Sequence, residues 1–175
     1  MAADYVVRPA VRADLAWLHG IERASSVLFP EGRLPDPDEV VPMPDLEAAC
    51  DRGLLLVAVC GDEVIGFAMG TEHGACLHLA QIAVRPDHGR RGVGTRLVRA
   101  VIDLAAARGR SAVTLTTFRD IPWNAPFYAK AGFRMLDEPE LSPMLRATLA
   151  REQSAGLADR VAMCCTLPPP NPPTP

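Results

Sequence analysis

The chain of 175 residues lacks the features that would assign it to a membrane, disulfide-stabilised or metal-binding class. Its longest uninterrupted apolar run, residues 54–60, is long enough for a buried strand and too short to cross a bilayer. The five cysteines form no CxxC pair and the four histidines form no HxxxH or HxH pair. We therefore expect free thiols, no disulfide framework and no metal site.

The formal net charge of −3 argues against a nucleic-acid partner, because a protein that binds nucleic acid with its whole surface is usually strongly basic. Residues 1–14 have no apolar core followed by a small-residue cleavage site, so we expect no secretory signal and a cytoplasmic protein without a membrane partner. With 49% apolar and 22% charged residues, the chain is typical of a globular domain. We expect one domain over residues 1–167 and a disordered, proline-rich tail over residues 168–175.

Hydrophobic periodicity predicts alternating helices and strands along this domain. A proline-rich loop is expected over residues 30–44, with a short helix after it. Three successive apolar runs with short turns between them predict an antiparallel meander. The expected strands cover residues 5–8, 54–60, 64–70, 77–84, 112–118, 133–136 and 160–167, and the expected helices begin near residues 14, 93, 124 and 142. This order predicts a mixed α/β (α+β) layer fold with helices packed on a sheet.

The segment of residues 81–98, QIAVRPDHGRRGVGTRLV, places the pair Arg90-Arg91 and a Gly-Val-Gly turn between an expected strand and an expected helix. The first N–H groups of a helix have no partner within it, and glycine lets anionic oxygens approach them closely. Arg90 and Arg91 add positive charge beside Gly92 and Gly94. The turn lacks the Gly-Lys-Ser/Thr of a P-loop and the third glycine of a dinucleotide fingerprint. It predicts a phosphate site, or else a simple connection with solvated arginines.

A second motif, NAPFYAKAGF at residues 124–133, predicts a short helix with Asn124 at its N-cap. Together the two motifs resemble the GNAT superfamily of N-acetyltransferases, and the order of elements over residues 5–136 is similar to that family. The opening segment, residues 6–29, is similar in a less specific way. The resemblance implies a GNAT-like, mostly antiparallel twisted sheet of six to seven strands with helices on both faces.

The resemblance also implies acetyl-coenzyme A as co-substrate. Its diphosphate would be held by backbone amides of the turn, and its pantetheine arm by a strand that splays from its neighbour. The implied cofactor-binding residues are Gly89, Arg90, Arg91, Gly92, Val93, Gly94 and Thr95 in the turn, Ile82, Ala83 and Val84 in the strand, and Asn124. The family usually has Gln or Arg where this chain has Gly89. A side-chain contact to phosphate is therefore lost here or moved to Arg90.

Tyr128 matches the family's usual general acid, which would protonate the departing thiolate. The alternative is a tyrosine that only packs beside Phe127. The N–H of Ile82 is implied as the donor to the carbonyl oxygen. Direct attack on the thioester needs no nucleophile from the protein, so the absence of a Ser-His-Asp or Cys-His set is consistent with this chemistry.

His78 is the candidate for the general base that takes the proton from the amine; if His78 has no such role, the sequence does not show which residue does. Strand alternation puts His78 on the same face as Ala80, Ile82 and Val84, and an imidazole titrates near neutral pH. The alternative is a hydrogen-bonded histidine without a chemical role. Four further residues are weaker candidates: Glu22 on the first helix, Glu72 and His73 in a turn and expected to be exposed, and Lys130, which either is solvated, as we expect, or reaches a coenzyme A phosphate. Gln81 cannot act as a base.

We therefore expect an acetyl-CoA-dependent N-acetyltransferase that moves the acetyl group directly to a primary amine of a small molecule or peptide. The alternative is a non-catalytic acyl-CoA-binding sensor or interaction module on the same fold. Acidic residues near the proline-rich loop either line a pocket for a cationic acceptor or are solvated; they are Glu22, Glu31, Asp36, Asp38 and Glu39. The strand at residues 160–167 is a candidate for pairing with a second subunit in a homodimer.

Overall fold

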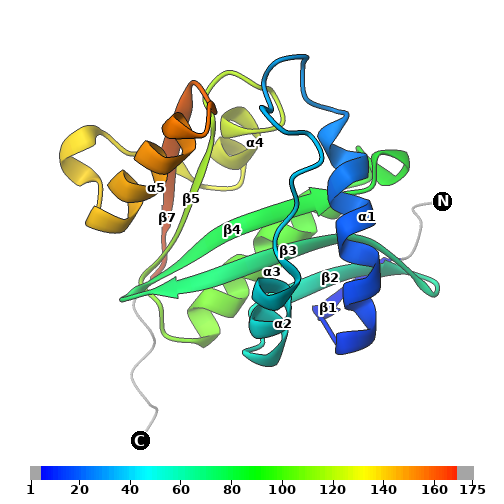
Figure 1. Ribbon diagram of the computed structural model, residues 1–175. Coiled ribbons are helices and arrows are strands. Elements are labelled where there is room, and N and C mark those ends of the chain that lie inside the picture. Colours follow the sequence, from blue (N-terminus) through cyan, green and yellow to red (C-terminus); the bar gives the residue numbers. More distant parts are fainter. Residues whose placement is uncertain (1–4, 169–175) are drawn as a thin grey trace, which may run out of the picture.

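A seven-stranded sheet forms the centre of the computed structural model, which describes residues 5–168 (Figure 1). The strand order is β1-β2-β3-β4-β5-β7-β6. All neighbours pair antiparallel except β4 and β5, which are parallel. The strands are β1 (Tyr5–Pro9), β2 (Leu55–Cys60), β3 (Glu63–His73), β4 (Cys76–Val84), β5 (Ala112–Phe118), β6 (Arg134–Met135) and β7 (Arg160–Thr166). The expected tail falls outside the described residues from position 169 onward.

Helices cover both faces of this sheet (Figure 1), as the family resemblance implied. In Figure 1, α1 and α2 lie in front of the strands, α3 lies behind them, and α5 covers β7. The helices are α1 (Leu15–Ser26), α2 (Met43–Asp51), α3 (Val93–Ala107), α4 (Ala125–Lys130) and α5 (Pro143–Ser154). Helix α2 begins earlier than expected because Pro44 lies in its first turn, where a missing N–H costs nothing. Within residues 5–168, no helix is long and apolar enough to cross a membrane.

The core is built by the meander and by α3. Val93, Leu97 and Val101 recur on one side of α3 and are buried against β2, β3 and β4. This is the apolar stripe that the spacing predicts. Each such side chain stabilises the fold by about 1.5–3 kcal/mol relative to full exposure. The packing holds the first turn of α3 in a fixed position at the end of β4.

Strands β4 and β5 separate after three residue pairs, of which His78 with Thr114 is the last. Beyond this point β4 continues beside β3, while β5 continues beside β7. The divergence opens the sheet between the two strands, as the resemblance implied.

A bulge in β4 overturns one prediction from strand alternation. Gly70 is opposite Leu79 and Met69 is opposite Gln81, so Ala80 has no partner on β3. Since neighbours on β3 face opposite sides of the sheet, Leu79 and Gln81 also face opposite sides. His78 therefore shares a face with Gln81, and the prediction that it shares one with Ile82 and Val84 is wrong.

Strand β7, which was expected to be a candidate for pairing with a second subunit, has neighbours on both sides within this chain. β7 pairs with β5 along its whole length, and β6 pairs with Cys164 and Met163 on its other side. It is an inner strand of the sheet, and the edge strands are β1 and β6.

Candidate functional site

The separation of β4 and β5 opens into a cleft of about 760 Å³. One wall is the end of β4 and the turn that leads into α3, and the opposite wall is α4 with the segment before it. The end of α1 and the residues after it complete the lining. The lining residues are Ser25, Leu28, Phe29, Ile82, Ala83, Val84, Pro86, His88, Gly89, Arg90, Gly92, Val93, Gly94, Thr95, Trp123, Asn124, Phe127 and Tyr128.

The β4 wall presents main-chain groups to this cleft. The N–H of Arg85 donates to the carbonyl of Ile65 on β3 at 2.9 Å. Since alternate residues of an antiparallel strand bond to opposite sides, the N–H groups of Val84 and Ile82 point away from β3. They lie on the side from which β5 has diverged, so this part of β4 can pair with an extended ligand.

The Ile82 N–H has a partner from its own strand. It donates to the side-chain oxygen of Gln81 at 3.0 Å, and the Gln81 amide nitrogen donates to Glu22 at 2.6 Å. Glu22 also accepts the N–H of Val41 at 3.2 Å. Burial raises the pKa of the Glu22 carboxyl, against the lowering effect of these hydrogen bonds. The implied donor Ile82 is thus hydrogen-bonded to a side chain that a bound carbonyl oxygen would have to displace.

The first turn of α3 keeps its N–H groups open. Gly92 is the N-cap, with φ of 80°, and no side chain caps the helix. The first backbone bond there runs from the N–H of Arg96 to the carbonyl of Gly92 at 3.0 Å. Within residues 5–168, the N–H groups of residues 93–95 have no acceptor, so a concentrated donor site faces the cleft.

The three glycines of this turn have different physical roles. Gly92 is needed for its positive φ, and a Cβ there would point at the Tyr5 hydroxyl, 3.4 Å away. A Cβ on Gly94 would lie 3.6 Å from the ring of Phe127, which also lines the cleft. A Cβ on Gly89 would lie 3.0 Å from the carbonyl oxygen of Pro86, closer than side chains normally allow. A larger residue at position 89 would therefore require this turn to move.

Arg90 has φ of 58°, a left-handed conformation that costs a non-glycine residue about 1 kcal/mol or more. Arg90 and Arg91 are exposed, and neither forms an ion pair with another residue of the described chain. Beside them, the Nδ1 atom of His88 is buried without a hydrogen-bond partner among residues 5–168. The turn thus combines open N–H groups, two unpaired cations and one unsatisfied imidazole nitrogen.

Tyr128 lies on the opposite wall with its ring packed against Phe127 and Phe133, at centroid distances of 5.1 and 5.8 Å. Its hydroxyl forms no hydrogen bond with the described residues, although the side chain lines the cleft. Burial raises the pKa of Tyr128 to about 12, so the phenol stays protonated at neutral pH. Asn124 occupies the N-cap as predicted, but its side chain accepts the Thr117 hydroxyl at 2.7 Å and does not cap α4.

Residues 19–133 match the sequence model of the Acetyltransferase (GNAT) family. The chain belongs to the GNAT acetyltransferase family. Solved structures agree with this assignment at the level of the fold. PaiA N-acetyltransferase from Thermoplasma acidophilum, determined with coenzyme A, has a TM-score of 0.70 at 17% identity, covering 94% of this chain and 99% of that one.

Two further relatives have the same fold. Ribosomal-protein-S18-alanine N-acetyltransferase from Escherichia coli has a TM-score of 0.66 at 17% identity, covering 98% of this chain and 100% of that one. N-acetylglutamate synthase from Neisseria gonorrhoeae, determined with coenzyme A and N-acetyl-glutamate, has a TM-score of 0.74 at 20% identity. That alignment covers 95% of this GNAT chain and 36% of the synthase chain, so the present chain spans little more than a third of the synthase.

In this GNAT chain His78 is not among the residues that line the cleft with Tyr128. Its Nδ1 atom is 3.0 Å from the Thr114 hydroxyl, and the side chain lines a second cavity of about 370 Å³. Burial lowers the pKa of His78 to about 4, so the imidazole is neutral at pH 7. The structure therefore does not bring the candidate base and the candidate acid together in one cavity.

The weaker candidates lie outside the cleft. Glu72 belongs to β3, and its side chain is 16% exposed because three arginines hold it: Arg52, Arg108 and Arg110. The expectation that Glu72 is exposed is wrong, because the sequence does not show that these arginines meet there. His73 is exposed as expected, and Lys130 is exposed and does not line the cleft.

Three large apolar residues that line the GNAT cleft were not predicted from the sequence: Leu28, Phe29 and Trp123. Phe29 packs against the ring of Trp123 at a centroid distance of 6.4 Å, which joins the end of α1 to the segment before α4. The proline-rich stretch that follows Phe29 was the available signal, since such loops often border binding sites. It did not show which side chains would face inward.

Proposed function

We propose that this chain is an acetyl-CoA-dependent N-acetyltransferase that moves an acetyl group directly to a primary amine of a small molecule or peptide. One observation carries the proposal: the open N–H groups at the start of α3 and the unpaired Tyr128 hydroxyl line the same cleft. A diphosphate and a thioester group belong to one acetyl-coenzyme A molecule, so both features are needed in a single cavity.

The turn fits a diphosphate. The N–H groups of residues 93–95, the positive end of the α3 dipole and the two exposed arginines attract anionic oxygens. Gly94 leaves the wall beside Phe127 open. Along β4, the outward N–H groups of Ile82 and Val84 suit the amide groups of a pantetheine arm, with Ala83 between them and Asn124 on the opposite wall.

When bound, acetyl-coenzyme A supplies a thioester carbonyl that an amine attacks directly. The Tyr128 hydroxyl is protonated at neutral pH and donates its proton to the departing sulfur. The N–H of Ile82, once Gln81 has turned away, donates a hydrogen bond to the carbonyl oxygen. Phe127 and Phe133 hold the Tyr128 ring in place, so little reorganisation is needed during the reaction.

The base stays a prediction. His78 is neutral at pH 7, as a base must be, but it lines the second cavity. It can accept a proton only from an amine held between the two cavities, directly or through water. A cytoplasmic location and a homodimer likewise stay predictions.

The test is release of free coenzyme A from acetyl-coenzyme A with a panel of primary amines. Release is best measured by chromatography, because the protein has five cysteines of its own that react with thiol reagents. Amine-dependent release that is lost in Tyr128→Phe supports the proposal. Saturable binding of acetyl-coenzyme A without release for any amine would instead indicate the binding module.

A further inference from the structure

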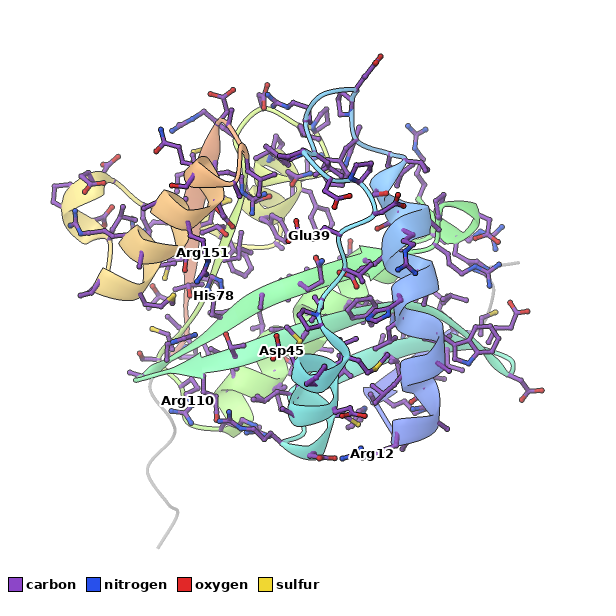
Figure 2. All side chains as sticks on the ribbon, in the orientation of Figure 1. Arg12, Glu39, Asp45, His78, Arg110 and Arg151 are labelled. Carbon is purple, nitrogen blue, oxygen red and sulfur yellow. The ribbon has the colours of Figure 1, made fainter. Side chains whose placement is uncertain are left out.

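The second cavity lies between α5 and the paired ends of β3, β4 and β5. Figure 2 shows Arg151 on α5 close to His78 on β4, on the face of the sheet that α5 covers. The cavity is lined mostly by polar side chains. The lining residues are Thr71, His73, His78, Ala80, Thr116, Met144, Ala147, Thr148, Arg151 and Glu152.

This cavity adjoins the cleft along β4. Ala80 lines the cavity and Ile82 lines the cleft, and Gln81 is the one residue between them along the strand. Two residues of a strand span about 7 Å. An acceptor amine beside Ile82 can therefore extend its other end into the cavity through a short chain of atoms.

The uncompensated charge of the cavity is positive. Glu152 is matched by Arg160, which donates two hydrogen bonds to it at 2.9 and 3.1 Å, and by the Thr116 hydroxyl at 2.7 Å. The side chain of Arg151, an exposed residue, forms no hydrogen bond or ion pair with the other residues of the described chain. Arg151 is thus the one charged group of the lining that a ligand can still neutralise.

The two histidines of the cavity are each within hydrogen-bond distance of a threonine hydroxyl. His78 is 6% exposed, and burial, with a smaller effect of the Arg151 guanidinium, lowers its pKa to about 4, so its ring is neutral at pH 7. One ring nitrogen of His78 meets the Thr114 hydroxyl, and His73 meets the Thr71 hydroxyl at 3.1 Å. Hydroxyl and imidazole groups beside one free guanidinium are suited to a carboxylate.

We propose that the second cavity binds the carboxylate of the acceptor, so that the substrate is a small primary amine with an acidic group a short chain away. Arg151 is the specificity-determining residue. Acetylation of the amino group of this substrate rests on the proposed function. Binding of its carboxylate beside Arg151 does not depend on that function.

The experiment compares three probes of matched carbon-chain length: 4-aminobutyrate, butylamine and 1,4-diaminobutane. Each is titrated into the protein with coenzyme A bound, while the ring signals of His73 and His78 are followed by NMR. Release of coenzyme A from acetyl-coenzyme A is measured with the same probes. We expect 4-aminobutyrate alone to shift both rings, and its kcat/KM to exceed that of the other two by on the order of tenfold.

Variants separate recognition from folding. Arg151→Gln should remove the preference for 4-aminobutyrate, Arg151→Lys should retain part of it, and Arg151→Glu should favour the diamine. Arg99→Gln is the matched control, because Arg99 is an exposed arginine on α3 that does not line the cavity. It removes the same charge and should leave the preference unchanged.

Equal ring shifts for all three probes, shifts with the diamine alone, or a preference that survives in Arg151→Gln would overturn the inference. Ring shifts that depend on Arg151, without release of coenzyme A from any amine, would support the carboxylate site and overturn the proposed transfer. The two failures are therefore distinguishable.

Discussion

Gln81 donates a 2.6 Å hydrogen bond to the buried carboxylate of Glu22. The other end of the same side chain accepts the Ile82 N–H at 3.0 Å. A residue of the first helix thereby holds Gln81 on the main-chain donor that faces the cleft. In the absence of ligand, this donor is satisfied by the protein itself.

Replacing Gln81 with methionine should release the Ile82 N–H while keeping the length of the side chain. Acetyl-coenzyme A, which has a carbonyl oxygen to place there, should then bind about threefold more tightly, and free coenzyme A should be little affected. Calorimetry with both ligands gives the ratio of their dissociation constants. An unchanged ratio would show that the carbonyl oxygen does not meet Ile82.

The raised pKa of Glu22 predicts how stability depends on pH. The folded state binds this proton more tightly than the unfolded state does, so the free energy of unfolding falls as pH rises from 4.5 through the raised pKa. Glu22→Gln has no such proton, and its profile should lack this fall. Urea unfolding across this range measures the difference. Parallel profiles for the two proteins would mean that burial does not perturb Glu22.

Tyr128→Phe should lower turnover about tenfold or more, with little change in affinity for acetyl-coenzyme A. Its thermal stability should stay near that of the wild type, because the hydroxyl has no hydrogen-bond partner in the described chain and the ring contacts with Phe127 and Phe133 are retained. Steady-state kinetics and a melting curve decide this together. Full turnover in a well-folded variant would remove Tyr128 from the chemistry.

Arg90 should show opposite effects on stability and on binding. Arg90→Gly relieves the left-handed strain and should stabilise the protein by about 1 kcal/mol, while weakening binding of coenzyme A several-fold. Asp159 is a matched control, because it is also a non-glycine residue with positive φ, at 55°, and does not line the cleft. Asp159→Gly should leave binding unchanged, and equal effects of the two variants on binding would argue against a phosphate contact by Arg90.

Gly94→Val places a branched side chain beside Phe127 in the lining of the cleft. We expect binding of coenzyme A to fall by tenfold or more, on the scale of several lost hydrogen bonds to charged oxygens. Gly20→Val is the control, since Gly20 is also helical and a Cβ there meets nothing within 4 Å. Calorimetry on both variants, with circular dichroism as a check on folding, separates a blocked site from a destabilised helix.

The local sequence pattern was sufficient to predict the strand, the helix and the glycine turn that surround the cleft. Strand β5 begins and ends where its run of apolar and β-branched residues predicts, at Ala112 and Phe118. The apolar stripe of α3 is buried as its spacing predicts, and the glycine turn lies at the start of that helix. These features depend on neighbouring residues, so the sequence contains the information directly.

Features that depend on distant residues were not predictable in this way. The unpaired Ala80 in β4 reverses the face of His78, and it arises from the register with β3. The position of β7 between β5 and β6, and the capture of Glu72 by three arginines, also arise from long-range pairing. Alternation with a period of two residues carries no signal of a bulge. The strand itself could therefore be predicted, but the face of the sheet on which His78 lies could not.

A crystal structure with coenzyme A bound tests the central claim most directly. The account predicts diphosphate oxygens on the N–H groups of residues 93–95, a pantetheine arm along Ile82 and Val84, and the sulfur next to the Tyr128 hydroxyl. Density for the diphosphate away from the start of α3, or a sulfur far from Tyr128, would contradict it.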